Sequence, residues 1–415
     1  MSKKVIVIGG GIIGLCSAYF LQKEGHEVTV IDKSGLDSGA SYVNAGYLSP
    51  SHIIPLSAPG VVKKGLKWML SPSSPFYVKP RMDLEFLKWA WAFNASCNSK
   101  HVERTAPVIR DITILSQRLF EDIIKSEKLN AHYKKKGLIM LCQTQKMLEE
   151  EIKILKLAQS LGLEAQEYSI RDIESIEPNV KINSIGGTYY KCDHHSTPHE
   201  FMTQLKTHLK DVGVTFRSND EVVDFKFSDR KITNIITTKF NVAADEFVLA
   251  SGSWTAKLVK KMGLKLLLQA GKGYRIDSKQ KTKITVPAIL AEAKVAVTPM
   301  NGFTRFAGTM EIAGINHNIN KVRVEAISRA VKQYYPNIEP TEQEKSNARC
   351  GLRPVSPDGL PYIGKSSKFC NLTIAAGHAM MGWSMGTATG LFVAEIISDK
   401  KPSLDLKPFH PERQF

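Results

Sequence analysis

The 415-residue sequence contains no uninterrupted apolar stretch of roughly 18 to 20 residues, the length that an α-helix needs to cross a bilayer. We therefore do not expect an integral membrane protein. The apolar run near the N-terminus is broken by glycines and no small-residue cleavage site follows it, so we do not interpret it as a secretory signal.

Clustered cysteine is also absent. The six cysteines are scattered singly and none forms a CxxC motif. This spacing does not indicate a disulfide framework, and structural zinc needs clustered ligands. We expect a reducing, cytoplasmic compartment and no metal centre.

Acidic residues are fewer than basic ones, 40 against 56, and the formal net charge is +16. Such an excess admits an anionic partner such as lipid, nucleic acid or an acidic protein. The alternative is that the lysine-rich faces are simply solvated. We favour this alternative and expect no nucleic-acid partner, because no arginine-aromatic block or nucleic-acid module focuses the charge. Length and composition indicate a globular enzyme with two domains.

The segment from Lys4 to Asp32 is the clearest pattern in the chain. A β-branched run is followed at once by Gly9-x-Gly11-x-x-Gly14, then by apolar residues at helical spacing and a second β-branched run. This order predicts a strand, a tight turn, a helix and a parallel strand. Phosphates can bind at the helix N-terminus, and the carboxylate of Asp32 can accept the ribose hydroxyls of an adenosine. We therefore expect a dinucleotide-binding βαβ unit.

Three further segments rich in small residues are expected to lie over the dinucleotide. Residues 33–50 form a long loop without periodicity, and Ser251-Gly252-Ser253-Trp254 follows a β-run. The loop from Gly377 to Trp383 leads into a helix over Ser384 to Ile397, whose N-terminus is a second anion site.

The chain resembles bacterial D-amino acid dehydrogenases in SYVNAGYLSP (residues 41–50) and in residues 58–70 and 84–93. Residues 351–364 nearly match the motif GLRPxTPDGxPxIG of these enzymes. The wider family also contains D-amino acid oxidase, glycine oxidase and sarcosine oxidase. The resemblance covers essentially the whole chain and implies FAD as the cofactor. It departs from the dehydrogenases at Ser51-His52 and at residues 378–381, which leaves the preferred amino acid open.

The resemblance also implies roles for individual residues. The arginine of GLRP, Arg353, binds the substrate carboxylate in the family, and the alternative is a structural pairing with Asp358 or Asp193. Tyr274 follows the Gly-Tyr pattern of a substrate-side strand, and the alternative is a tyrosine that fills the sheet face.

His52 and His378 are candidate proton acceptors, although ordinary loop histidines are the more usual reading. Some relatives bind flavin covalently near the position of Cys350, but the dehydrogenase pattern implies non-covalent FAD. The expected cofactor-binding residues are Gly9, Gly11, Ile12, Ile13, Gly14, Asp32, Lys33, Gly39, Ala40, Ser41, Asn44, Ala45, Gly46, Leu48, Val222, Ser251, Gly252, Trp254, Gly377, His378, Met381, Gly382, Trp383, Ser384 and Met385.

The expected fold is α/β. A Rossmann-like FAD-binding domain, residues 1–50, 195–265 and 345–415, is interleaved with a substrate domain, residues 51–194 and 266–344. The resemblance and the strand candidates imply that the second domain has a mostly antiparallel sheet with helices.

Helices over Pro59 to Leu70 and Leu84 to Phe93 combine Trp68, Trp89 and Trp91 with lysines. They could rest on a membrane surface or belong to the core with their lysines at the surface. Both interpretations remain open, and a peripheral location on the inner face of the cell membrane is included in our expectation.

We expect FAD-dependent oxidative deamination of D-amino acids, cyclic ones such as D-proline and D-hydroxyproline included. The electrons would pass to a quinone or another acceptor. One alternative is an oxidase of the glycine or sarcosine type, which uses oxygen and releases hydrogen peroxide. A tRNA-directed FAD enzyme is a further alternative, disfavoured because the sequence contains no fused methyltransferase domain and no RNA-binding module.

Overall fold

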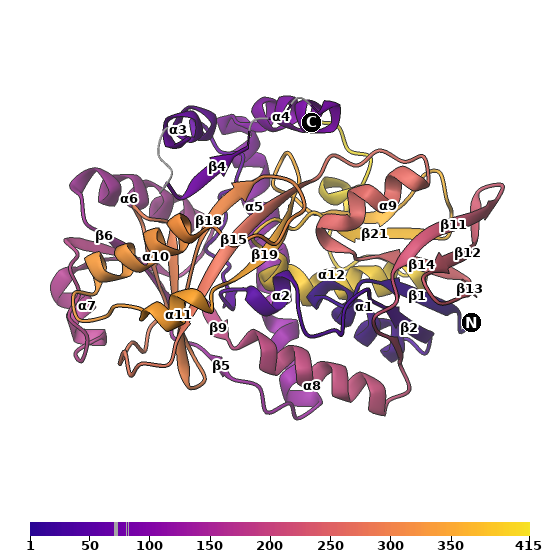
Figure 1. Ribbon diagram of the computed structural model, residues 1–415, viewed down its shortest axis with the longest axis horizontal. Coiled ribbons are helices and arrows are strands. Elements are labelled where there is room, and N and C mark those ends of the chain that lie inside the picture. Colours follow the sequence, from indigo (N-terminus) through magenta and orange to yellow (C-terminus); the bar gives the residue numbers. More distant parts are fainter. Residues whose placement is uncertain (70–73, 80, 82) are drawn as a thin grey trace.

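The computed structural model describes residues 1–69, 74–79, 81 and 83–415. Within these ranges the strands form one six-stranded sheet, one nine-stranded sheet and two three-stranded sheets. We call the six-stranded one the parallel sheet and the nine-stranded one the large sheet. The parallel sheet lies on one side of the molecule and the large sheet on the other (Figure 1). This arrangement confirms the expected α/β fold.

The parallel sheet is built around the βαβ unit predicted from the sequence. Its strand order is β10 (Thr215–Arg217), β2 (Glu27–Ile31), β1 (Lys4–Ile8), β14 (Glu246–Leu249), β21 (Leu372–Ala376) and β20 (Tyr362–Lys365). The first five strands are parallel, whereas β20 runs antiparallel to β21. Strand β1 is almost entirely buried, as expected for a parallel sheet covered on both faces.

Two long apolar helices pack against each other beside this sheet, α1 (Ile12–Lys23) and α12 (Gly382–Ile397). Glycines allow the close approach: a Cβ atom at Gly390 would overlap the backbone of Cys16, and one at Gly386 would press on Ile12. Helices α5 (Ser99–Ser126) and α8 (Pro198–Asp211) contribute Phe120 and Phe201 to the same core. The two helix N-termini that the sequence singled out are therefore held by one packed core.

The large sheet is mostly antiparallel, as the resemblance implied. Its order is β19 (Arg349–Val355), β15 (Gln269–Ser278), β18 (Phe303–Ile312), β17 (Val295–Met300), β16 (Ala288–Leu290), β6 (Leu138–Cys142), β8 (Gly186–Tyr190) and β7 (Ala165–Ser169), and β4 (Phe76–Val78) also pairs with β18. Helix α10 (Lys321–Tyr334) packs on this sheet over an apolar cluster that includes Tyr274, Ile276 and Phe306.

The remaining elements complete the fold. The small sheets contain β11 (Val222–Ser228), β12 (Lys231–Thr237) and β13 (Asn241–Ala243), and β3 (Tyr47–Leu48), β9 (His194–Ser196) and β5 (Tyr133–Lys134). The other helices are α2 (Ala40–Val43), α3 (Val61–Trp68), α4 (Leu84–Ser96), α6 (Gln145–Ser160), α7 (Ile170–Ile176), α9 (Thr255–Lys261), α11 (Glu342–Ser346), and the 3-10 turns η1 (Gly252–Trp254) and η2 (Lys407–Phe409).

Three details differ from the sequence-based expectations. Residues 33–50 are not entirely loop, since they contain α2 and β3. Strand β19 falls within the range 345–415 that we assigned to the cofactor domain, yet it pairs with β15 and forms an edge of the large sheet. Trp89 is buried, and its indole N–H donates to the Val355 carbonyl at 2.9 Å. Its ring therefore cannot lie on a membrane.

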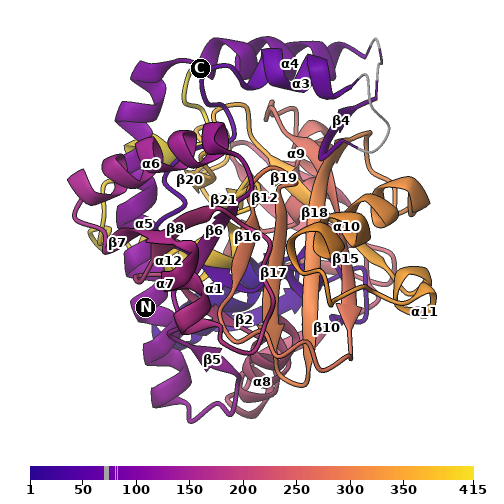
Figure 2. The ribbon, with the colours of Figure 1, turned by 90° about the vertical axis from the view of Figure 1, so that its left-hand side faces the viewer.

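Helices α3 and α4 lie next to each other at one edge of the molecule (Figures 1 and 2). The predicted helix over Pro59 to Leu70 corresponds to α3, and Leu70 itself lies outside the described residues. In the part of the chain that the structure describes, none of the helices combines the length and the apolar character needed to cross a membrane.

Candidate active site

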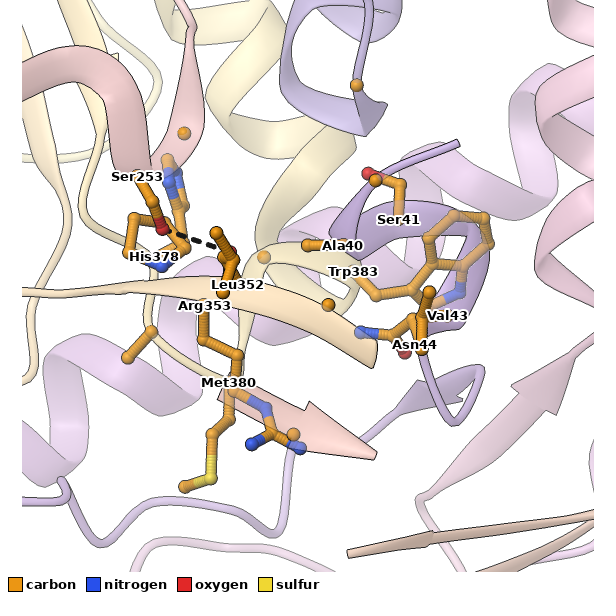
Figure 3. Close-up of a pocket in the computed structure, with 18 of the residues that line it drawn as sticks. Ala40, Ser41, Val43, Asn44, Ser253, Leu352, Arg353, His378, Met380 and Trp383 are labelled. Atoms are coloured by element: carbon orange, nitrogen blue, oxygen red, sulfur yellow. Dashed lines mark hydrogen bonds between the residues drawn. The ribbon is translucent and has the colours of Figure 1, made fainter. Parts of the chain in front are cut away.

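A cavity of about 1190 Å³ runs between the parallel sheet and the large sheet. Its walls come from the C-terminal ends of β1, β2 and β14, from the loop before α12, and from α2, β15, β18 and β19. Residues from three distant parts of the chain meet here: Ser41 and Asn44, Ser253, and Arg353 with His378 (Figure 3). In open α/β sheets, ligands bind at the C-terminal ends of the parallel strands, and the cavity adjoins these ends.

One end of the cavity has the features of a phosphate site. Gly9 has φ +112°, which favours glycine, and a Cβ atom at Gly14 would overlap the Gly9 carbonyl. Helix α1 begins after Gly11 without a side-chain cap on its N-cap residue, and the Ile12 N–H donates to Ser41 Oγ at 3.0 Å. The first turn of α1 therefore presents backbone N–H groups to the cavity.

Asp32 closes this end of the cavity. Its Oδ2 accepts the Gly10 N–H at 2.7 Å, and its Oδ1 accepts the N–H and the hydroxyl of Ser34 at 2.7 and 2.6 Å. These bonds hold the carboxylate still while leaving lone pairs for ribose hydroxyls. Nearby, Lys33 Nζ lies 3.3 Å from the centre of the Trp254 ring, a cation–π contact that joins two of the predicted cofactor segments.

The N-terminus of α12 forms the second anion site. The N-cap residue, Met381, makes no side-chain capping bond, so the first N–H groups of this helix remain free for a ligand. Ser384 Oγ donates to the Tyr47 carbonyl at 2.8 Å and accepts the Ser49 N–H at 3.2 Å. The Trp383 indole donates to Ser196 Oγ at 2.9 Å. These bonds fix the helix end against the loop on the opposite wall.

The residues along this cavity fit FAD. Two helix N-termini whose N-cap residues make no side-chain capping bond face the same space, one beside the Asp32 carboxylate and one beside the large sheet. Asp220 lines the cavity as well, is 1% exposed, and has no hydrogen-bond partner at Oδ2 among the described residues. A bound ligand with hydroxyl or amine donors would satisfy that atom.

Arg353 projects from β19 toward β15, where its guanidinium lies directly over Gly273. A Cβ atom at Gly273 would overlap the guanidinium, so glycine provides the space that the arginine occupies. Arg353 Nη1 donates to the Thr309 carbonyl at 2.6 Å. Thr309 has φ +71°, a conformation that is strained for a β-branched residue, and it lies at an irregularity in the pairing of β15 with β18.

No carboxylate among the described residues lies within ion-pair distance of Arg353. Asp358 is bound instead by Arg413, at 2.7 and 2.8 Å, and Asp193 accepts the N–H and hydroxyl of Ser51 at 3.0 and 2.6 Å. The structural pairings considered as alternatives are therefore wrong. Burial lowers the pKa of Arg353 to about 10, so the guanidinium remains charged at neutral pH.

The two candidate histidines differ in availability. His378 is 2% exposed and its Nε2 is bonded to Thr389 Oγ1 at 2.9 Å, which fits a structural role in the loop before α12. His52 lines the cavity, and its Nδ1 has no hydrogen-bond partner in the described structure. Burial lowers the pKa of His52 to about 4 and that of His378 below its ordinary range, to about 3. Both imidazoles are therefore neutral near pH 7.

Tyr274 is among the residues that line the cavity, but it also belongs to the apolar cluster beneath α10 on the large sheet. Its hydroxyl donates to Glu311 Oε2 at 2.8 Å, and Glu311 also pairs with Lys272 at 3.1 Å and Arg323 at 3.2 Å. The ring therefore fits the alternative role, a tyrosine that fills the sheet face, better than a role in the pocket.

Cys350 lines the cavity, and burial raises the pKa of its thiol. A protonated thiol is a poor nucleophile, so this environment gives no chemical support for a covalent flavin link.

Sequence reasoning missed several residues of the cavity wall. Asp220, Glu151, Lys294 and Thr309 belong to different elements and match no local motif. Only the folded chain brings this helix, strand, loop and turn to one cavity. Thr309 in particular carries no signal, because threonine is a common strand residue and its positive φ is visible only in the folded chain.

The chain is similar to known proteins along nearly its whole length. Residues 4–396 match the model of the FAD dependent oxidoreductase family. The D-amino acid dehydrogenase of Vibrio atlanticus is 33% identical over 405 residues, 95% of this chain and 96% of the relative. The D-amino acid dehydrogenase of Helicobacter pylori is 32% identical over 401 residues, 96% of both chains.

Solved structures show the same fold. Glycine oxidase from Geobacillus kaustophilus superimposes with a TM-score of 0.80 at 22% identity, covering 100% of this chain and 99% of that one. L-proline dehydrogenase from P. horikoshii gives 0.78 at 19% identity, covering 99% and 97%.

The fold and the two anion sites define a dinucleotide-binding flavoenzyme. The chain belongs to the FAD dependent oxidoreductase family, it is an FAD-dependent oxidoreductase, and FAD is its cofactor.

Proposed function

We propose that this enzyme oxidises D-amino acids at Cα to imino acids, which water hydrolyses to 2-oxo acids. The observation that carries the proposal is Arg353, a charged guanidinium without a carboxylate partner in the described structure, in the same cavity as the two helix N-termini. Its planar fork matches a carboxylate bidentately. The naming of the relatives as D-amino acid dehydrogenases supports the choice of D-configured substrates.

The residues of this chain would act mainly by positioning. Arg353 would hold the substrate carboxylate, and the Thr309 carbonyl would hold Arg353. Non-covalently bound FAD, when present, supplies the acceptor for the hydride from Cα. The N–H groups at the start of α12 would stabilise negative charge that develops beside them, without having to reorganise.

Removal of the proton from the substrate amine does not require a dedicated catalytic base. The substrate amine must be neutral when Cα is oxidised, so its proton passes to water or to a side chain of the cavity. His52 is the candidate of the two histidines, because it is neutral and its Nδ1 is not bonded. His378 is already bonded to Thr389.

We propose a quinone or similar molecule as electron acceptor, with α3 and α4 as the surface that meets the membrane. Leu66, Leu84 and Trp91 are 63%, 62% and 72% exposed on these helices. Exposed lysines lie among them, including Lys63, Lys67 and Lys88. Apolar side chains ringed by cations suit an anionic lipid surface.

Steady-state assays with a reducible dye under anaerobic conditions would test the proposal, in parallel with assays of peroxide formation in air. We expect dye reduction with D-alanine and other D-amino acids, little with the L-forms, and little peroxide. Rapid peroxide formation with glycine or sarcosine, and no dye reduction with D-amino acids, would instead establish the oxidase.

A further inference from the structure

The cavity has a further polar region on its wall besides Arg353. It contains His52 from the loop after β3, Glu151 from α6 and Lys294 from the turn between β16 and β17. We call these three residues the polar chamber. They come from three separate elements, and the roles assigned so far to Arg353 and the two helix ends use neither Glu151 nor Lys294.

The polar groups of the polar chamber find few hydrogen-bond partners among one another. Glu151 is 4% exposed, and within the described structure its only polar partner is Lys294 Nζ, at 3.6 Å. His52 Nδ1 has no partner there. Lys294 is close enough to His52 for its charge to help lower the histidine pKa. Buried polar groups are normally hydrogen-bonded, so the unpartnered His52 Nδ1 beside the long Glu151–Lys294 ion pair indicates a ligand with complementary groups.

Small side chains connect the polar chamber with Arg353. Ala296 of β17 and Ala307 of β18 are directly paired, and both line the cavity together with Gly308. Because these residues are small, they leave the cavity open along β17 and β18, between the arginine and the polar chamber. We call this part of the wall the floor of the cavity. A substrate held at its carboxylate by Arg353 can therefore extend its side chain along this floor.

We propose that the polar chamber is the subsite for the substrate side chain and selects D-amino acids whose side chain ends in an uncharged hydrogen-bonding group, such as a carboxamide. The polar chamber has one cation, one anion and one neutral imidazole. A carboxylate side chain would meet Glu151, and an ammonium side chain would meet Lys294. A carboxamide offers two N–H donors and a carbonyl acceptor, which the carboxylate, the ammonium and the imidazole can all match.

This inference rests on the proposed oxidation of D-amino acids. D-asparagine and D-leucine are a matched pair for testing it, because they have nearly the same shape and differ in hydrogen bonding. A site that hydrogen-bonds its substrate discriminates strongly against an analogue that lacks the polar group. We expect kcat/KM to be at least about tenfold higher for D-asparagine than for D-leucine and for D-aspartate.

A charge variant tests the residues themselves. Glu151→Gln leaves Lys294 without its anion, so the ratio of kcat/KM for D-aspartate to that for D-asparagine should rise about tenfold. Glu150→Gln is the matched control, since Glu150 is the adjacent residue on α6, pairs with Lys64 at 2.9 Å, and does not line the cavity. It should leave the ratio unchanged. An unchanged ratio in Glu151→Gln, or equal changes in both variants, would overturn the proposal.

A binding measurement separates this proposal from the function on which it rests. Succinamate and 4-methylpentanoate are D-asparagine and D-leucine without the α-amine, so neither has a Cα–N bond that could be oxidised. Succinamate should raise the melting temperature of the holoenzyme more than 4-methylpentanoate, and Glu151→Gln should reduce that difference. Equal shifts would overturn the subsite, whereas a larger succinamate shift without any D-amino acid oxidation would overturn only the proposed reaction.

Discussion

At the scale of single residues, Arg353 carries the proposed chemistry. Replacing it with lysine keeps a positive charge but removes the fork that can bind a carboxylate through two hydrogen bonds. We predict that Arg353→Lys raises KM for D-alanine and lowers kcat/KM by roughly 10 to 100-fold, the equivalent of a charged hydrogen bond. Steady-state kinetics with a dye acceptor would measure this.

The control for Arg353→Lys is Arg329→Lys, on the exposed face of α10. This substitution replaces a solvent-exposed guanidinium and should leave KM and kcat/KM unchanged. Wild-type kinetics in Arg353→Lys would mean that another group binds the carboxylate.

Asp193 predicts a specific pH dependence of stability. Burial raises the pKa of this carboxyl from 3.8 to about 6, so the folded protein holds a proton that the unfolded chain releases. The resulting stabilisation is complete below pH 4 and is lost as pH rises through 6. The loss amounts to about 3 kcal/mol of unfolding free energy.

Asp193→Asn tests this directly, because an amide can replace both bonds to Ser51 without titrating. Denaturant unfolding at pH 4 to 7 should show the variant gaining stability relative to the wild type as pH rises. A difference between the two proteins that is constant with pH would show that Asp193 titrates normally.

Local motifs predicted some of these residues and could not predict others. Arg353 can be predicted because it sits in a contiguous motif. Its support, Gly273 on β15 and Thr309 on β18, cannot, because only the pairing of β19 with β15 and of β15 with β18 brings these residues to it. Tyr274 was placed near the pocket from the same kind of motif. In strands the side chain alternates between faces, and only the packed sheet reveals that Tyr274 points toward α10.

At the scale of elements, we propose that the turn from β1 to α1 and the end of β2 form the adenosine site. We predict that Asp32→Asn weakens FAD binding by about tenfold, because one of the two acceptor oxygens becomes a donor. The measurement is a titration of apoprotein with FAD, followed by flavin fluorescence. Asp224→Asn, at an exposed position of β11, is the control and should bind FAD normally. Equal affinity in Asp32→Asn would place the ribose elsewhere.

Long periodic elements were predictable and short ones were not. The β1, α1 and β2 sequence follows from glycine spacing and β-branched runs, and α12 follows from a glycine-rich turn before an apolar helix. Helix α2 has only four residues, Ala40–Val43, too few for any helical periodicity. It is held in place by Arg305, whose Nη1 donates to the carbonyls of Tyr42 and Asn44 at 3.2 and 2.7 Å. That contact comes from the large sheet and has no local sequence signal.

At the scale of the whole molecule, helices α3 and α4 lie next to each other near an edge of the protein (Figure 2), and both carry exposed apolar residues. We predict that the holoenzyme co-sediments with anionic vesicles and less with neutral ones, and that raised salt weakens the binding. Trp91→Gln should reduce vesicle binding several-fold without changing dye-coupled activity in solution.

Phe240→Gln is the matched control for Trp91→Gln, since Phe240 is 53% exposed in a loop distant in sequence from α3 and α4. It should bind vesicles as the wild type does. Equal losses in the two variants, or no binding to anionic vesicles, would remove the membrane from the proposed function.

The interleaving of the two sheets was predictable only in outline. The chain passes from one sheet to the other several times, and β19 shows why a boundary drawn at residue 345 fails: it precedes strands of the parallel sheet but pairs with β15. Apolar strands suit either sheet, so hydrogen-bond partners rather than composition decide their membership. The pairing of β19 with β15 also places Arg353 in the same cavity as the segments expected to bind the cofactor.

The central claim is that Arg353 and the two helix ends form one site for oxidising D-amino acids. Its most direct test is anaerobic mixing of the holoenzyme with D-alanine or L-alanine while the visible absorbance of oxidised flavin is recorded. We predict bleaching by D-alanine, little by L-alanine, and slow recovery when air is admitted. No bleaching by D-alanine or any other D-amino acid would contradict the account.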